Sequence, residues 1–242
     1  MKIYTDVEQG SGDWFKLRLG IPTASCFDKI VTPKKCELSK SSVSYALKLV
    51  AEKLLNCPSE SIDGVMYMER GQELEPQAVR QYEFTNDVQT VKVGFITTDD
   101  GSMGCSPDRL VVAEQRIALE VKCPAPHVHL GYLVNGSADE YTPQVQGQIL
   151  IAELDRADLY AFHPRMPPAL IRTYRDMEYI RKLEAALVAF RDLLGDLTER
   201  AKALGVYQAF EQARSPMELA AAQELDQQMR GDADMIYRHG FA

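Results

Sequence analysis

The stretch from Gly104 to Pro124, GCSPDRLVVAEQRIALEVKCP, constrains the fold of this chain more than any other segment. Asp108 precedes a short apolar run, residues 110–113, and a polar turn then leads into a second run that carries Glu120 and Lys122. Two apolar runs joined by a short polar turn predict a β-hairpin. Because side chains alternate along a strand, Glu120 and Lys122 point to one face and their apolar neighbours point into a core.

The charges on this hairpin have two readings. One is an ordinary surface hairpin with a Glu–Lys pair, because solvated charges are common on strands. The other is a buried site, in which the two acids and the lysine need compensation that a divalent cation supplies. Carboxylate oxygens are ligands that Mg²⁺ prefers, and a neighbouring ammonium can hold or polarise a water beside the metal. The spacing D-x11-E-x-K, preceded by Ser106-Pro107 and closed by Cys123-Pro124, favours the second reading.

Composition and net charge indicate where the protein works and which classes of protein are excluded. With 242 residues, of which 45% are apolar, the chain can bury a sizeable core. No apolar run approaches the length that crosses a bilayer and the first residues hold no signal-peptide core, so we expect a cytoplasmic protein. The five scattered cysteines form no C-x-x-C pair, which argues against a disulfide framework or a zinc site. The net charge of −8 opposes DNA binding over the whole surface but is compatible with a local basic channel.

Periodicity and turn residues predict further elements along the chain. We expect helices at residues 14–19, 23–31, 41–56, 66–85, 140–154, 177–204 and 215–229, and strands at 89–97, 159–163 and 169–174. Pro76 falls inside the fourth of these helices, beside Glu75, where it either kinks the helix or restarts it. The segment after Pro124, which contains His127 and His129, is predicted to be a loop.

Polar side chains gather at two of the predicted helices. Arg18 lies shortly before the helix start at Thr23 and Ser25. These residues are either a surface arginine and a helix cap, or a phosphate pocket, because a guanidinium and helix-terminal N–H groups both favour an anion. Gln144 and Gln148 lie one turn apart on a single helical face.

Five motifs in a fixed order resemble those of the lambda-type phage alkaline exonucleases, which are YqaJ-like viral recombinases within the PD-(D/E)xK nuclease superfamily. They are W-x-x-L-R-x-G-x-x-T-A-S, R-G-Q-E-L-E, C-S-P-D, L-E-V-K-C-P and Q-V-Q. The similarity extends from about Gly12 to Arg175. Each motif alone is weakly specific, whereas the ordered set is highly specific.

The resemblance implies an α/β (α+β) fold with a restriction-endonuclease-like core, in which helices flank a central mixed β-sheet. Residues 1–204 would be the exonuclease domain and residues 205–242 an additional C-terminal helical extension. The implied activity is processive 5′ to 3′ digestion of one strand from a duplex DNA end, with two Mg²⁺ ions and with Mn²⁺ as a substitute. The remaining 3′ single strand would serve phage-type recombination. Implied partners are two further copies in a ring-shaped homotrimer and a single-strand annealing protein, in a phage or prophage context in a bacterial host.

The resemblance also implies roles for single residues. The metal ligands would be Asp108, Glu120 and the backbone carbonyl of Val121, and Glu75 would bind the second metal or the attacking water. Lys122 would position the attacking water, and Gln144 would support the site. The 5′-phosphate of the digested strand would be held by Arg18, Ser25 and Ser106. Met68 would be the apolar wedge that splays the end of the duplex.

One feature departs from the family pattern. The loop after Cys123-Pro124 reads APHVHL and lacks an arginine that helps to hold the phosphate in the family. His127 or His129 replaces it, or the preference for a phosphate is weaker. Two alternatives to the exonuclease remain, namely a restriction-type endonuclease of the same fold and a non-catalytic protein that binds DNA ends. An iron–sulfur nuclease is disfavoured because no cysteine follows Cys123.

Overall fold

The computed structural model describes residues 1–58 and 65–206, and for residues 65–72 it describes the backbone alone. The helix predicted at 215–229 and the side chain of Met68 therefore lie outside the described part of the chain. The chain divides into two compact units, residues 1–195 and 196–242. The predicted domain boundary after residue 204 stays a prediction. Within the described ranges, none of the helices combines the length and the apolar character that spanning a bilayer requires.

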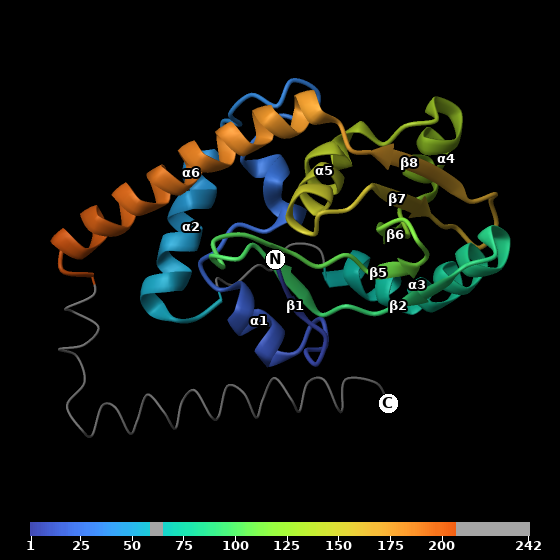
Figure 1. The fold of residues 1–242 in the computed structure, drawn as a ribbon, viewed down its shortest axis with the longest axis horizontal. Helices are drawn as coiled ribbons and strands as arrows, with labels where there is room; N and C mark the ends of the chain where they lie inside the picture. Colours follow the sequence, from blue (N-terminus) through green and yellow to red (C-terminus); the bar gives the residue numbers. More distant parts are fainter. Residues whose placement is uncertain (59–64, 207–242) are drawn as a thin grey trace. The chain divides into compact units, whose positions relative to one another are not determined.

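A run of helices after β1 is followed by a run of strands, β2 to β6, and then by further helices and strands (Figure 1). The α-helices are α1 (Gly12–Arg18), α2 (Ser42–Leu55), α3 (Val65–Asn86), α4 (Pro126–Asn135), α5 (Thr142–Ile151) and α6 (Met177–Ala203), and two short 3₁₀ helices are η1 (Ala24–Lys29) and η2 (Asp139–Tyr141). The strands are β1 (Lys2–Tyr4), β2 (Gln89–Val91), β3 (Phe95–Thr97), β4 (Gly104–Cys105), β5 (Arg109–Val112), β6 (Ile117–Lys122), β7 (Arg156–Ala161) and β8 (Ala169–Tyr174). The predicted bounds of α2, α6 and β8 agree with these to within a residue or two.

The predicted hairpin forms the middle of a five-stranded sheet with the order β2-β5-β6-β7-β8. β5 and β6 pair antiparallel, with Arg109 opposite Leu119. β6 and β7 pair parallel, with Glu120 opposite Leu159, and the connection between them carries α4, η2 and α5. This single parallel pair makes the sheet mixed, as predicted. It also brings the helix with the two glutamines back over the strand that carries Glu120.

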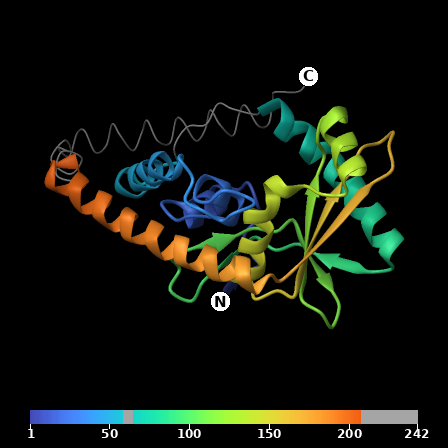
Figure 2. The same ribbon diagram turned by 90° about the horizontal axis from the view of Figure 1, so that it is seen from above.

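Helices cover both faces of this sheet. α3 packs on the face formed by Leu119, Val121 and Tyr160, and its buried residues Ala78 and Tyr82 belong to that core. α5 packs on the opposite face, toward which Glu120 points, and Figure 2 shows the two helices on either side of the strands. The alternation of side chains along β6 thus separates an apolar face from a polar one.

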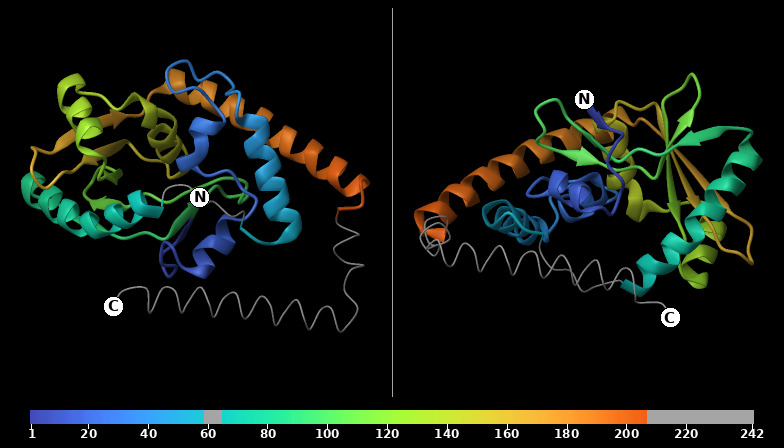
Figure 3. Two further views of the ribbon diagram at one scale, coloured as in Figure 1. Left: turned by 180° about the vertical axis from the view of Figure 1, so that it is seen from behind. Right: turned by 90° about the horizontal axis from the view of Figure 1, so that it is seen from below.

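α5 also contacts η1, so that it lies between the sheet and the N-terminal segment (Figure 3). Gly147 allows this close approach, because a Cβ atom there would clash with the ring of Phe27. The arrangement matters for the site, since Arg18 and Ser25 line the same cavity as Glu120 and Lys122 of β6 although nearly a hundred positions separate them in sequence.

The segment 89–97, predicted as one strand, forms two strands in different sheets. β2 is an edge of the five-stranded sheet, whereas β3 lies in a small sheet with the order β1-β3-β4. The chain passes from one sheet to the other at residues 92–94. A Cβ atom at Gly94 would clash with the backbone oxygens of Tyr4 and Val7. The prediction of one strand is wrong because β-branched residues lie on both sides of this break and conceal it.

The segment after Pro124, predicted as a loop, is helix α4. Pro126 occupies the first turn, where its missing N–H costs nothing, and Gly136 ends the helix with φ 66°. Both signals were present in the sequence. Pro76 lies inside α3, which continues from Val65 to Asn86, so the helix does not restart there.

Candidate active site

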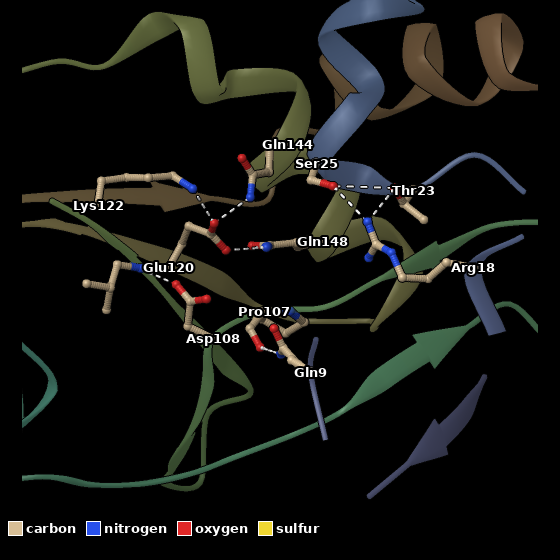
Figure 4. Close-up of polar contacts among 11 residues, drawn as sticks. Gln9, Arg18, Thr23, Ser25, Pro107, Asp108, Glu120, Lys122, Gln144 and Gln148 are labelled. Carbon is tan, nitrogen blue, oxygen red and sulfur yellow. Dashed lines mark hydrogen bonds and ion pairs between the residues drawn. The ribbon is translucent and has the colours of Figure 1, made fainter. Parts of the chain in front are cut away.

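The carboxylate of Glu120 lies at the centre of a buried polar cluster. Its side chain is almost fully buried on the face of β6 covered by α5. Lys122 Nζ and Gln144 Nε2 donate to Oε1 at 2.6 and 2.5 Å, and Gln148 Nε2 donates to Oε2 at 2.7 Å. Figure 4 shows these three side chains converging on Glu120. The reading of this segment as an ordinary solvated hairpin is therefore wrong.

Asp108 completes a pair of carboxylates. It lies directly before β5, and its Oδ2 accepts a hydrogen bond of 2.6 Å from the backbone N–H of Val121. Burial raises the pKa of Asp108 well above its usual range, and the negative charge of Glu120 raises it further. No Lys or Arg of the described ranges forms an ion pair with Asp108. The ionised form of Asp108 therefore has no contacting counter-charge among the described residues.

Lys122 remains protonated in this environment. Burial opposes its charge, but the negative charges of Glu120 and Asp108 outweigh that effect and raise the pKa of Lys122. The ammonium lies 5.0 Å from the centre of the Tyr141 ring. Lys122 also lines the cavity, so its ammonium is placed to donate hydrogen bonds to a water there.

Glu75 reaches the same cavity from α3, but the guanidinium of Arg109 already contacts its carboxylate. Arg109 Nη1 lies 3.1 Å from Glu75 Oε1. Within the described part of the chain, no three acidic, His or Cys side chains form a ready-made metal cage. The oxygen donors that fit a hard cation best are thus Asp108 and Glu120, with the Val121 carbonyl between them in sequence. The absence of a contacting Lys or Arg at Asp108 within the described ranges supports that fit.

A second polar cluster surrounds Arg18. Its guanidinium donates to Ser106 Oγ at 3.2 Å, to Thr23 Oγ1 at 3.2 Å and to Ser25 Oγ at 3.4 Å. The group stacks on the Trp14 ring at 4.0 Å, and Trp14 Nε1 donates to Ser106 Oγ at 3.0 Å. Burial lowers the pKa of Arg18. The alternative of a surface arginine and a capping serine is wrong, because the half-buried Arg18 points its guanidinium at these hydroxyls and no side chain caps η1.

One cavity of about 720 Å³ joins the two clusters. Its lining includes Arg18, Ser25 and Ser106 on one side and Glu75, Asp108, Glu120, Lys122 and Gln144 on the other. An anion held at Arg18 therefore shares an open space with the paired carboxylates. Every predicted site residue whose side chain is described lies in this cavity.

The two histidines after Pro124 differ in position. His127 is exposed and lines the cavity. His129 is fully buried, and its Nε2 lies 2.8 Å from the backbone carbonyl of Pro167. Of the two candidates for the role of the missing arginine, His127 alone reaches the cavity.

Three residues of the site were missed by sequence reasoning about function. Gln148 had a signal, because it lies one turn after Gln144 on the same helical face. Trp14 belongs to the first motif, but nothing in the motif assigns it to Ser106. Arg109 had no signal beyond its place next to Asp108.

The family of this chain can now be stated. Residues 13–155 match the YqaJ-like viral recombinase domain, and the chain belongs to that family. Comparison with curated proteins gave no match.

Solved structures share the fold. An alkaline exonuclease from Laribacter hongkongensis, LHK-Exo, is 28% identical with a TM-score of 0.72, and the match covers 82% of this chain and 100% of that one. The same protein in complex with dAMP matches equally well. A phage-related exonuclease from Haemophilus somnus is 18% identical with a TM-score of 0.60, over 74% of this chain and 96% of that one. The predicted fold class is confirmed.

Proposed function

We propose that this protein is a DNA exonuclease of phage-type recombination, which digests one strand of a duplex from its 5′ end with Mg²⁺ and leaves a 3′ single strand. Membership of the viral recombinase family and likeness to an alkaline exonuclease support the class of enzyme. The observation that carries the proposal is one cavity that joins a buried Asp–Glu–Lys set to an arginine-and-hydroxyl pocket for an anion.

Asp108, Glu120 and the Val121 carbonyl are the proposed ligands of one metal ion, and Glu75 contributes to the second. When bound, Mg²⁺, or Mn²⁺ in its place, offsets the negative charge that develops during phosphodiester hydrolysis. Lys122, which donates to Glu120 Oε1 at 2.6 Å, would position the attacking water. Gln144 and Gln148 each donate to one oxygen of Glu120, which fixes the plane of its carboxylate.

The Arg18 cluster is the proposed pocket for a 5′-phosphate. A guanidinium and three hydroxyls, those of Thr23, Ser25 and Ser106, suit the oxygens of a terminal phosphate. Such a pocket explains polarity, because only a strand end that carries a phosphate fills it while its first phosphodiester lies at the carboxylates. His127 is the proposed additional contact.

Further parts of the proposal concern assembly and context. We propose a homotrimeric ring that holds the duplex and makes digestion processive, with Met68 as the wedge that opens the end. Residues 1–204 are the proposed exonuclease domain and residues 205–242 a helical extension. A single-strand annealing protein is the proposed partner, because resection exposes a strand that recombination must anneal. The proposed setting is the cytoplasm of a bacterial host of a phage or prophage.

Digestion of end-labelled linear duplex tests the function. We expect digestion from 5′-phosphorylated ends with Mg²⁺, none with EDTA, and no cutting of closed circular DNA. Asp108→Asn keeps an oxygen for the Val121 N–H but removes the charge. It should therefore reduce the rate of DNA digestion on the order of a hundredfold or more, which exceeds the loss typical of residues that hold a metal ligand without contacting the metal.

Asp192→Asn, at an exposed position of α6, is the matched control and should digest DNA at the parent rate. Cutting of closed circles would indicate an endonuclease. Parent-like digestion by the Asp108→Asn protein would overturn the assignment of the site.

A further inference from the structure

Arg109 connects two parts of the candidate active site. It is the first residue of β5 and follows Asp108 directly. Its Nη1 donates to the backbone carbonyl of Asp108 at 2.7 Å and lies 3.1 Å from Glu75 Oε1. The Arg109 side chain is 13% exposed and that of Glu75 30%. A single guanidinium nitrogen therefore bridges helix α3 and the start of the strand that positions Asp108.

The charges around the cavity show what this bridge does. Glu120 is paired with Lys122 at 2.6 Å, and Glu75 is paired with Arg109. Asp108 is the remaining acid of the three. A cation that binds at Asp108 and Glu120 meets, in Asp108, a carboxylate that no Lys or Arg of the described ranges contacts within ion-pair distance. A cation that binds at Glu75 must share that carboxylate with a guanidinium that is already in contact.

We propose that Arg109 is a positioning residue that holds Glu75 at the edge of the cavity and weakens divalent-cation binding there. This inference rests on the proposed function, because it concerns the same metal ligands. It makes the two cation sites unequal. The site at Asp108 and Glu120 is tight, and the site that depends on Glu75 fills only at higher cation concentration.

Mn²⁺ titration of the DNA-free full-length protein, followed by the electron paramagnetic resonance signal of free Mn²⁺, tests this proposal. We expect the parent to show a tight site that Asp108→Asn removes and a weak site that Glu75→Gln removes. Arg109→Gln should tighten the weak site about tenfold and leave the tight site within about twofold. That factor lies between the small effect of an exposed ion pair and the large effect of a buried one.

The matched control is Arg116→Gln. Arg116 lies in the turn of the same hairpin, is half exposed, and pairs with Glu153 at 3.6 Å. This variant changes the net charge by the same amount and should leave both Mn²⁺ affinities unchanged. The double variant Arg109→Gln, Glu75→Gln should lose the weak site and with it the tenfold gain.

A purely structural ion pair predicts a different pattern. It would lower the free energy of unfolding in Arg109→Gln and leave Mn²⁺ binding as in the parent, and that result would overturn the proposal. If the Gln variant does not fold, Arg109→Lys decides. Its shorter side chain retracts the charge from Glu75, so the weak site must still tighten by a smaller factor, and an unchanged affinity refutes the proposal.

The failure of this inference is distinguishable from the failure of the proposed function. Mn²⁺ binding is measured without DNA. A protein that binds Mn²⁺ as described but leaves duplex ends intact would overturn the function alone. A protein that digests DNA but whose Mn²⁺ affinities are unchanged by Arg109→Gln would overturn the inference alone.

Discussion

The role of Gln148 leads to the sharpest prediction about this site. Gln148 is 1% exposed and supplies the donor at 2.7 Å to Oε2 of Glu120, whereas Lys122 and Gln144 both contact Oε1. Gln148→Leu keeps most of the volume and removes this donor. The carboxylate then has donors on one oxygen only, so its plane is free to turn away from the position that faces Asp108.

The expected cost in stability is modest. A hydrogen bond to a charged group contributes about 1.5–3 kcal/mol to folding. The substitution also removes Gln148 Oε1, which has no hydrogen-bond partner among the described residues, and relief of that buried oxygen returns roughly 1 kcal/mol. We therefore expect the free energy of unfolding to fall by about 1 kcal/mol. The rate of DNA digestion should fall more, by about 10- to 100-fold, as for other groups that orient a metal ligand.

Gln146 provides the matched control on the same helix. It is 3% exposed, donates to the Tyr174 carbonyl at 2.9 Å and accepts from the Asp176 N–H at 3.3 Å, and within the described residues its side chain forms no hydrogen bond with Glu120. Gln146→Leu should lower the free energy of unfolding by about 1–2 kcal/mol, because two hydrogen bonds are lost, and should leave the rate unchanged.

Two assays separate the effects. Urea unfolding followed by circular dichroism gives the stability, and initial rates on end-labelled duplex at saturating Mg²⁺ give the activity. A Gln148→Leu protein that digests DNA at the parent rate refutes the orienting role. So does a pair of variants whose rates decline in proportion to their stabilities, because the effect on rate would then reflect folding alone.

Two further predictions concern other parts of the molecule. Arg18→Ala should abolish the preference for 5′-phosphorylated over 5′-hydroxyl duplex ends and His127→Ala should reduce it, because both side chains line the cavity with the proposed phosphate pocket. Competition between the two kinds of duplex end measures this preference. Equal rates of the parent protein on both kinds of end would argue against the pocket. Tyr82→Phe should lower the free energy of unfolding by about 1–2 kcal/mol in urea, since its hydroxyl donates to the fully buried Asp158 at 2.7 Å, and an unchanged midpoint would contradict that role.

Local patterns in the sequence were enough to predict the helices and strands in which apolar residues keep one spacing from end to end. The β5–β6 hairpin, strand β8 and helix α6 each carry an uninterrupted repeat of apolar positions, and turn or capping residues mark their ends. The predictions at 89–97 and after Pro124 are wrong because the signals there conflict. β-branched residues lie on both sides of the break at residues 92–94, so the sequence favours one continuous strand there. The prediction of a loop after Pro124 overlooked the helix start at Pro126.

The chemistry of the site divides in the same way. Asp108, Glu120 and Lys122 lie on one short hairpin, so their alternation along the strands already predicted a shared site. Family resemblance added Glu75 and the Arg18 pocket, and the structure brings them into the same cavity.

Contacts between distant segments were decided by the tertiary structure alone. Trp14 forms a hydrogen bond with Ser106, 92 positions away in the sequence. Arg109, on a strand, forms an ion pair with Glu75, on a helix, and the side-chain repeats of these two elements differ. No repeat in the sequence encodes such a pair, because it forms only when the parallel pairing of β6 with β7 and the packing of α3 and α5 bring the elements together. The sequence by itself determined which charged groups this protein places on one hairpin. The packing of helices on both faces of the sheet decided which of those charges are paired and which carboxylate is left to attract a cation.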